Sequence, residues 1–216
     1  MSTGFPEWMN SVYSSPRLTP YLRHSQGDPA RAVNLYYWNT MVSAAFLGPL
    51  HTFELALRNS VHNRLGTHFR QEDWWNRAPL DNEGQRLVHQ AQSRFRRAAT
   101  PDDIVAELSL GFWTSLIARR YDRTLWVPAL HRAFPGYRGP RRDLQDQLYS
   151  LRLLRNRIMH CEPIHHRHLE ADHAKLYQVL SYINPEAATG IKPMDRVPEV
   201  LLVKEQMCRG DLPPSF

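Results

Sequence analysis

The stretch LQDQLYSLRLLRNRIMH, residues 144–160, decides the fold class of this chain. Its apolar residues recur at steps of three, four and seven: Leu144, Leu148, Leu151 and Ile158. On a helix of about 100° per residue these side chains form one stripe, so the pattern predicts a helix over residues 141–160. Arg155 falls in the same stripe. Its guanidinium therefore needs a carboxylate, a facing subunit or a bound anion, unless it snorkels from the edge of the core.

The helical period returns in several other segments. It predicts helices over residues 30–66, 81–99 and 166–183, with Gly48-Pro49 kinking or dividing the first of them. A further helix should begin at Pro101, because Thr100 is a cap residue and acidic residues follow in the first turn. No segment alternates with period two for long enough to predict a strand. The expected class is all-α, most simply an antiparallel helical bundle.

The first thirty residues have a different composition. Prolines at four positions stand among serines and aromatic residues: Pro6, Pro16, Pro20 and Pro29. This composition predicts an extended N-terminal arm over residues 1–30, followed by a single helical domain over residues 31–216.

The chain is basic and rich in arginine. Its formal net charge is +6, and all but three of the 27 basic residues are arginine. The arginine fork matches phosphate oxygens, so this composition suits a polyanion such as RNA, although a GC-rich genome would give the same bias. The two cysteines form no disulfide framework, and no leader or membrane-spanning stretch is evident. We expect a cytoplasmic protein without a membrane partner.

The end of the 141–160 helix carries the groups needed for chemistry on a phosphodiester. Arg152, Asn156 and His160 follow one another at spacing four, so the amide of Asn156 can orient the imidazole of His160. Pro163 should end the helix near His160 or Cys161. Arg155 and His160, five residues apart, point about 140° from each other on a straight helix. The two side chains meet at one phosphate only if the helix end unwinds or a second copy contributes, and a symmetric dimer is the favoured arrangement.

The pattern Arg155-Asn156-x-x-x-His160 resembles the signature of the HEPN superfamily of helical ribonucleases, in particular its abortive-infection (Abi-like) branch. The resemblance covers roughly residues 35–185. Further matching segments occur in the same order: Phe53–Asn59, Trp74-Trp75, Asp103–Trp113, Leu125-Trp126 and Glu162–Ile164.

The resemblance implies a bundle that dimerises through the motif helix and cuts RNA without a metal. It further implies a toxin or a phage-defence effector, with RNA, a second copy of the chain and an antitoxin or other regulator as partners. In this chain Arg155 and His160 would be catalytic and Asn156 would position them. No cofactor and no metal are expected. The chemistry would move a proton through His160, stabilise the phosphorane with Arg155 and leave 2′,3′-cyclic phosphate ends.

Other residues are assigned roles around the motif. Glu54, Arg58 and His62 share one helix face with Asn59 beside them; Glu54 pairs either with an arginine of the motif helix or only with Arg58. The predicted positioning residues are therefore Asn156, Glu54, Arg58, Asn59 and Glu162. The candidates for RNA binding are Arg152, Arg157, Arg141 and Arg142.

Two features depart from the family. Cys161 stands where Abi-like sequences often have a second histidine, which weakens any role for that position. Glu162 stands where toxins silenced by a nucleotidyltransferase antitoxin have a tyrosine, which argues against regulation by modification there.

Three alternatives remain open. The chain could be a non-catalytic RNA-binding or protein-interaction module that keeps the fold, with His160 merely ending a helix. The histidines between residues 160 and 173 suggest zinc, but they lack a recognised ligand spacing. Trp74 and Trp75, expected in a loop, could stack RNA bases.

Overall fold

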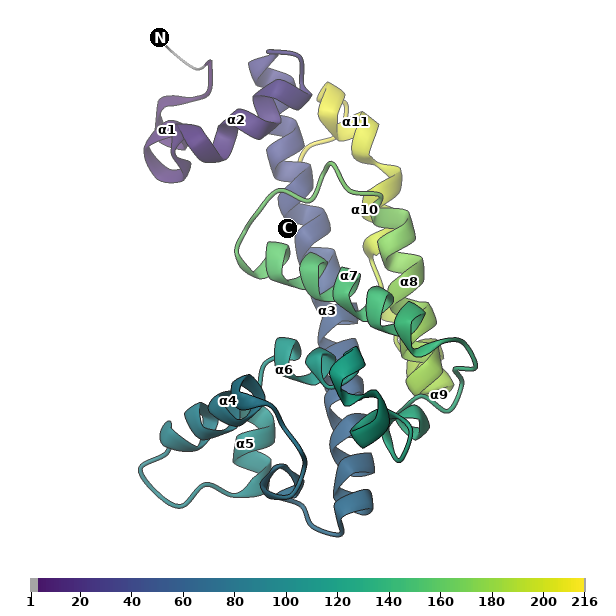
Figure 1. Cartoon of the computed structure of the whole chain (residues 1–216). Helices are drawn as coiled ribbons and strands as arrows, with labels where there is room; N and C mark the ends of the chain where they lie inside the picture. Colours follow the sequence, from purple (N-terminus) through teal and green to yellow (C-terminus); the bar gives the residue numbers. More distant parts are fainter. Residues whose placement is uncertain (1–3, 216) are drawn as a thin grey trace. The chain divides into compact units, whose positions relative to one another are not determined.

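The computed structural model describes residues 4–215, and within them the chain is built from helices without a β-strand (Figure 1). The all-α class is therefore confirmed. The α-helices are α1 (Glu7–Tyr13), α2 (Ser15–His24), α3 (Pro29–Phe69), α4 (Asn82–Ser93), α5 (Pro101–Glu107), α6 (Leu110–Ser115), α7 (Arg141–Met159), α8 (Leu169–Ile183), α9 (Pro185–Gly190), α10 (Val197–Leu202) and α11 (Lys204–Arg209). Short 3₁₀ or π turns lie at Trp74–Asn76, Arg119–Tyr121, Asp122–Trp126, Leu130–Ala133 and Lys192–Met194. None of the helices over residues 4–215 combines the length and apolar composition needed to cross a bilayer.

The chain divides into two compact units. The first unit comprises Met1–Pro49, Leu154–His173 and Pro193–Phe216, and the second comprises Leu50–Leu153 and Ala174–Lys192. This division differs from the expected arm followed by one domain, because the N-terminal segment belongs to the same unit as the motif and the C-terminal helices.

The expectation of an extended arm over residues 1–30 is wrong, leaving aside residues 1–3, which lie outside the described residues. Helices α1 and α2 occupy most of this segment. Three of its prolines stand where helices begin: Pro6 is the residue before α1, Pro16 lies in the first turn of α2, and Pro29 is the first residue of α3. Proline is well suited to a helix start, since the first N–H groups have no partner within the helix. Composition alone does not distinguish this use of proline from an extended arm.

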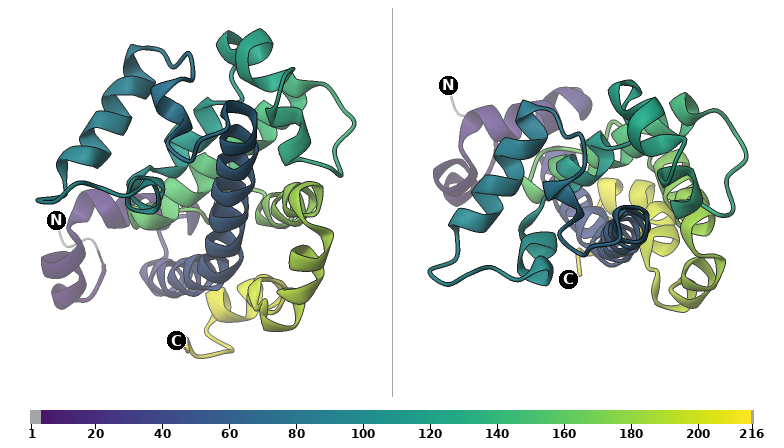
Figure 2. Two further views of the ribbon diagram at one scale, coloured as in Figure 1. Left: turned by 90° about the horizontal axis from the view of Figure 1, so that it is seen from below. Right: turned by 60° about the horizontal axis from the view of Figure 1, so that its bottom comes forward.

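Helix α3 is one helix of 41 residues that continues through Gly48 and Pro49 (Figure 2). Of the two expected effects of this pair, division of the helix is wrong and a kink stays a prediction. The border between the two units falls directly after Pro49. Phe46 and Leu50, on either side of the pair, are both buried. We attribute the continuity of α3 to this burial, which offsets the N–H that proline lacks.

The core of the first unit forms around Trp38 of α3. Its indole Nε1 donates to the carbonyl of Val200 at 2.8 Å, and the ammonium of Lys204 lies 4.6 Å from its ring centroid. Arg31 pairs with Glu205 at 3.1 Å on the same side of the unit. These contacts attach α10 and α11 to α3, which sequence periodicity did not predict.

The second unit buries the aromatic residues of the chain's middle. Trp74 is fully buried, and its Nε1 donates to Nδ1 of His62 at 3.1 Å. Trp75 is also buried, so the hypothesis that this pair stacks RNA bases is wrong. Helix α5 ends before Leu108, whose ψ of 125° is extended, and Ser109 caps the separate helix α6. The extent of α7 agrees with the helix predicted over residues 141–160.

The predicted start of α5 is confirmed by a capping box. The Thr100 hydroxyl accepts from the Asp103 N–H at 3.3 Å, and the Asp103 carboxylate accepts from the Thr100 N–H at 2.8 Å. Asp103 also forms a paired contact with Arg97, at 2.7 and 2.9 Å.

Replacing the cap should destabilise the protein measurably. We expect Thr100→Ala to lower the free energy of unfolding by about 1 kcal/mol, because the first turn loses its acceptor. For a chain of this size that corresponds to a melting temperature about 2–4 °C lower. Thr100→Ser, which keeps the hydroxyl, should melt close to the wild type. Equal melting of Thr100→Ala and wild type in calorimetry would contradict the role of the cap.

Candidate functional site

Helix α7 ends directly before the candidate catalytic histidine. The N–H of Cys161 donates to the carbonyl of Ile158 at 3.0 Å, and the N–H of Glu162 donates to that of Arg157 at 2.8 Å. Cys161 has φ of 54°, in the left-handed region. This pair of bonds closes the helix in the manner of a Schellman motif, with Cys161 where glycine is usual. The predicted helix end is confirmed, and His160 lies in the last closed turn.

A buried amide fixes the segment that follows, here called the motif loop (residues 160–168). Oδ1 of Asn39 accepts from the backbone N–H of Ile164 at 2.8 Å and of His165 at 3.0 Å. Asn39 is only 5% exposed and lies on the same buried face of α3 as Trp38 and Val42. One side chain therefore satisfies two buried N–H groups of the motif loop, which would otherwise be costly to leave unpaired.

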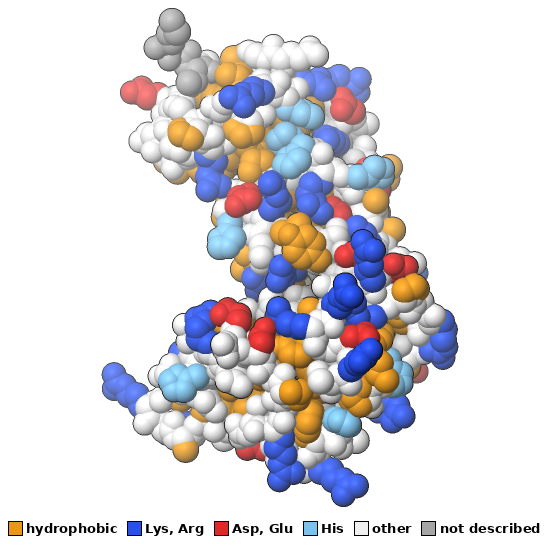
Figure 3. Space-filling model, viewed as in Figure 1, with side chains coloured by type: hydrophobic (Ala, Val, Ile, Leu, Met, Phe, Trp, Pro, Cys, Tyr) orange, Lys and Arg blue, Asp and Glu red, His pale blue; other side chains and the backbone are white. Residues whose placement is uncertain are grey.

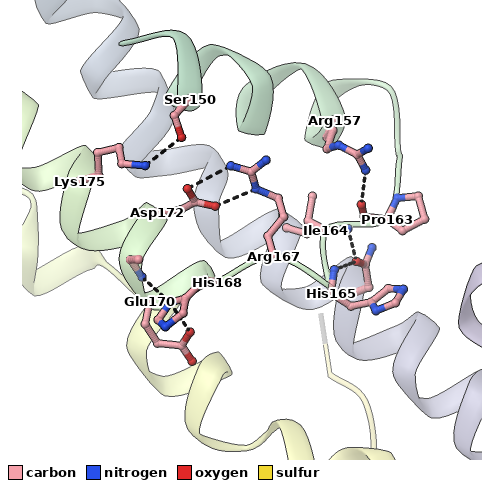
Figure 4. A network of polar contacts seen from close by, with 12 residues as sticks. Ser150, Arg157, Pro163, Ile164, His165, Arg167, His168, Glu170, Asp172 and Lys175 are labelled. Atoms are coloured by element: carbon pink, nitrogen blue, oxygen red, sulfur yellow. Dashed lines mark hydrogen bonds and ion pairs between the residues drawn. The ribbon is translucent and has the colours of Figure 1, made fainter. Parts of the chain in front are cut away.

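Three cationic side chains bind carbonyl groups of the motif loop. Arg157 Nη1 donates to Pro163 at 2.9 Å, as Figure 4 shows, and Lys204 Nζ donates to His165 at 3.2 Å. Arg17 of α2 donates to the carbonyl of Cys161. Since these cations come from three different elements, the loop is held from several sides.

The end of the motif loop is held by a two-pronged ion pair. Arg167 contacts Asp172 through Nε at 2.7 Å and through Nη2 at 3.0 Å, and Asp172 is buried (Figure 4). Parallel N–H···O contacts of this kind are the strong form of an arginine–carboxylate pair. They fix the approach of the loop to the first turn of α8.

A row of aromatic rings ends at His165. Its ring centroid lies 4.9 Å from Tyr21, 4.7 Å from His24 and 5.5 Å from His166. His165 is only 4% exposed, and neither ring nitrogen has a hydrogen-bond partner among the described residues. Burial lowers its pKa to about 4, helped by the positive charges of His24, His166 and Lys204. The imidazole is therefore neutral at physiological pH.

The candidate catalytic residues all belong to the first unit. His160 is exposed and Arg155 and Asn156 are half-buried. Within residues 4–215, the side chains of Asn156 and His160 make no hydrogen bond, so the structure does not show the expected bond between them. His160 is thus exposed to solvent at a helix end whose last carbonyl groups are hydrogen-bonded.

Two residues near the motif are engaged in the loop itself. Arg157, predicted to bind RNA, donates from Nη1 to the carbonyl of Pro163, and the same nitrogen lies 3.8 Å from Oε2 of Glu162. Glu162, predicted to position the catalytic residues, has this ion pair as its contact. Both therefore shape the loop around His160.

The other three candidates for RNA binding lie in the second unit and differ in how exposed their side chains are to solvent. Arg141 is only 12% exposed and binds Asp122, Gln145 and the carbonyl of Ile117, so its charge is used within the unit, and its role in RNA binding stays a prediction. Arg142 is 85% exposed, with only a 3.9 Å ion pair to Asp146, and is available to a phosphate. Arg152 lies 5.1 Å from the ring centroid of Tyr149.

The Glu54 cluster also lies in the second unit. Glu54 and Arg58 are half-buried, and Asn59 is exposed. The Nε atoms of Arg58 and Arg152 are buried without hydrogen-bond partners among the described residues. A role of Glu54, Arg58 and Asn59 in positioning the motif stays a prediction.

Sequence reasoning missed the residues that hold the loop, namely Asn39, Arg17 and Lys204. The only signal for Asn39 is that it is a polar residue within an apolar helical stripe. Arg17 and Lys204 leave no local signal, because their partners are distant in the sequence.

Within the described part of the chain, no group of three or more histidine, cysteine, aspartate or glutamate side chains is arranged to hold a metal ion. Comparison of the chain with protein-family models, with curated proteins and with solved structures gives no match.

Asn39 allows a direct test of the loop's anchoring. Asn39→Leu, which has the same branched side-chain skeleton, removes the shared acceptor, and we expect it to lower the free energy of unfolding by about 2–4 kcal/mol for two orphaned N–H groups. Asn39→Asp keeps an acceptor oxygen and should lose much less. Chemical denaturation of the two variants measures this difference. Equal stability of the two variants would contradict it.

His165 predicts a pH dependence of stability. The unfolded chain binds a proton on this residue near pH 6.5, whereas the folded protein does so only near pH 4. Between these values the unfolded state binds more protons, so the free energy of unfolding falls as pH falls, by up to about 1.4 kcal/mol per pH unit. His165→Phe keeps an aromatic ring and does not titrate, so its denaturation midpoint should fall less between pH 7 and pH 4. If the denaturation midpoints of wild type and His165→Phe fell equally between pH 7 and pH 4, His165 would be excluded as the source of the pH dependence.

Proposed function

We propose that this protein is a metal-independent RNA endonuclease. The observation that carries the proposal is the exposed imidazole of His160. It lies at the end of α7, where the N–H groups of Cys161 and Glu162 complete the last turn. Asn39 then holds the motif loop that follows. Arg155 and Asn156 precede His160 in the same unit, in the spacing that resembles the HEPN signature. The assignment of Arg155 and His160 as catalytic and of Asn156 as their positioning residue rests on this arrangement.

The charge around the motif loop suits a polyanion. The charges of Arg157 and Arg167 lower the pKa of His166, after the larger effect of burial, and Lys204 acts in the same direction on His165. Positive charges therefore gather at the loop that carries His160. On the face seen in Figure 3, basic side chains and histidines are widely spread. A phosphate backbone near the loop would meet favourable potential.

The reaction needs no oxidant or cofactor. A base removes the proton of the 2′-hydroxyl, the oxygen attacks the adjacent phosphorus, and an acid protonates the departing 5′-oxygen. The products are a 2′,3′-cyclic phosphate and a 5′-hydroxyl. His160 serves in one of the two proton transfers, and Arg155 stabilises the extra negative charge of the phosphorane.

Each chain has a single His160, whereas the reaction needs both a base and an acid. Because Arg155 and His160 are five residues apart at the end of α7, a second copy of the chain is the simplest source of the other acid or base. We therefore include a homodimer formed through the motif helix in the proposal. The biological role implied by the resemblance is growth arrest, as a toxin or in defence against phage, in the cytoplasm and under the control of an antitoxin or other regulator.

A second candidate function is a non-catalytic RNA-binding or protein-interaction module. It is favoured by the side chains of Asn156 and His160, which are not hydrogen-bonded to each other. In that case the cationic loop would bind its partner, and His160 would only end the helix.

The two functions differ in an assay of RNA cleavage in EDTA. The wild type should cut a cellular RNA pool, and His160→Ala should cut about 10²–10⁴ times more slowly, because a positioned acid or base is lost. His89→Ala is a matched control, since His89 is an exposed histidine on α4 of the second unit. It should cut like the wild type.

Other outcomes would point away from the nuclease. Equal cleavage by wild type and His160→Ala would mean that another group or a contaminant is responsible. No cleavage by any of the proteins, with RNA still bound, would identify the binding module.

A further inference from the structure

Helices α1, α2 and α3 carry a series of aromatic rings that ends at the motif loop. Trp8, Tyr13, Tyr36 and Tyr21 follow one another in contact, and we call them the aromatic row. Their ring centroids are 5.9 Å apart for Trp8 and Tyr13, 4.7 Å for Tyr13 and Tyr36, and 5.2 Å for Tyr36 and Tyr21. Tyr21 then contacts His165. None of these tyrosines entered the sequence-based site.

The aromatic row changes from exposed to buried along its length. Tyr21 is buried, Tyr13 and Tyr36 are half-buried, and Trp8 is 51% exposed. Val12 is a second large hydrophobic residue exposed on α1, whereas Met9 is fully buried in the core. The indole of Trp8 thus offers an aromatic surface to solvent on a helix that is otherwise anchored.

Arg17 connects the aromatic row to the catalytic motif. It donates to the carbonyl of Cys161, the residue after His160, and its charge acts on both Tyr21 and Tyr36. Burial raises the pKa of Tyr36 to about 12, and the Cys161 thiol is among the neighbours that raise it further. The aromatic row, a guanidinium and the motif loop therefore lie together within the first unit.

We propose that the aromatic row is a subsite that stacks an unpaired RNA base beside the cleavage site, with Trp8 as its exposed ring. The exposed indole of Trp8 and, further along the row, the guanidinium of Arg17 match the two parts of an RNA strand, its planar bases and its phosphates. A base in a duplex is stacked within its own helix and offers no free face, so the subsite selects single-stranded RNA. This inference rests on the proposed function for the position of the cut, but the binding itself can be measured without cleavage.

The binding test uses His160→Ala as the parent protein, because cleavage by this variant should be slow, and a short fluorescein-labelled single-stranded oligouridylate in EDTA. Adding Trp8→Ala should weaken binding about five- to a hundredfold, the range expected for loss of one stacked base. Adding Trp8→Phe should restore most of the affinity, because a ring remains. Val12→Ala is the matched control on the same helix, and it should bind like the parent.

A second probe separates stacking from charge. An oligonucleotide of the same length without bases should bind weakly and should not respond to Trp8→Ala. Affinity of Trp8→Ala equal to that of its parent would overturn the proposal. So would a loss of dimerisation in sedimentation for both Trp8→Ala and Val12→Ala, which would make this surface a contact between copies of the chain.

The two proposals fail in different ways. If the wild type cuts no RNA but Trp8→Ala still weakens binding, the nuclease is wrong and the subsite stands. If the wild type cuts RNA and Trp8→Ala changes neither affinity nor KM, the nuclease stands and the subsite is wrong.

Discussion

The carboxamide of Asn39 is the constraint on which the candidate site depends. Its single oxygen accepts from two successive backbone N–H groups, those of Ile164 and His165, in a buried position. A loop that leaves a helix with a left-handed residue at Cys161 would otherwise have many accessible conformations. Asn39 removes this freedom, and the cations Arg157, Lys204 and Arg17 then have fixed carbonyls to bind. The result is a loop backbone fixed by several hydrogen bonds next to an exposed His160.

This arrangement separates the residues that hold the site from the residues that are offered to a substrate. Arg157 and Glu162 are neighbours of the motif, yet their contacts lie within the loop. Buried His165 is neutral, so its imidazole adds no charge to the loop. A group that transfers protons works best when its support does not move, because the reacting atoms must be held in a narrow geometry.

The sequence predicted the features that depend on local spacing. The stripe of α7, its end before Pro163 and the capping box at Thr100 each involve residues within a few positions of one another. The motif, too, is a local pattern on one helix. Such signals are readable because backbone geometry alone brings the residues together.

Features that depend on distant partners were not predicted. Asn39 and Ile164 are 125 residues apart, and Arg17 and Cys161 are 144 apart, so no spacing rule links them. The prolines of the first thirty residues were misjudged because proline favours both helix starts and extended chain. The contacts of Arg141 were not predicted either, because a basic residue at a helix start looks the same in the sequence whether it meets RNA or, as here, Asp122.

The proposed cleavage is tested most directly by the chemistry of the ends that the protein leaves on single-stranded RNA in EDTA. We predict 2′,3′-cyclic phosphate and 5′-hydroxyl ends, and no cutting of the same strand with its 2′-hydroxyls methylated. Fragments with 5′-phosphate ends, or continued cutting of the methylated strand, would contradict it, because neither outcome uses the 2′-oxygen as the nucleophile.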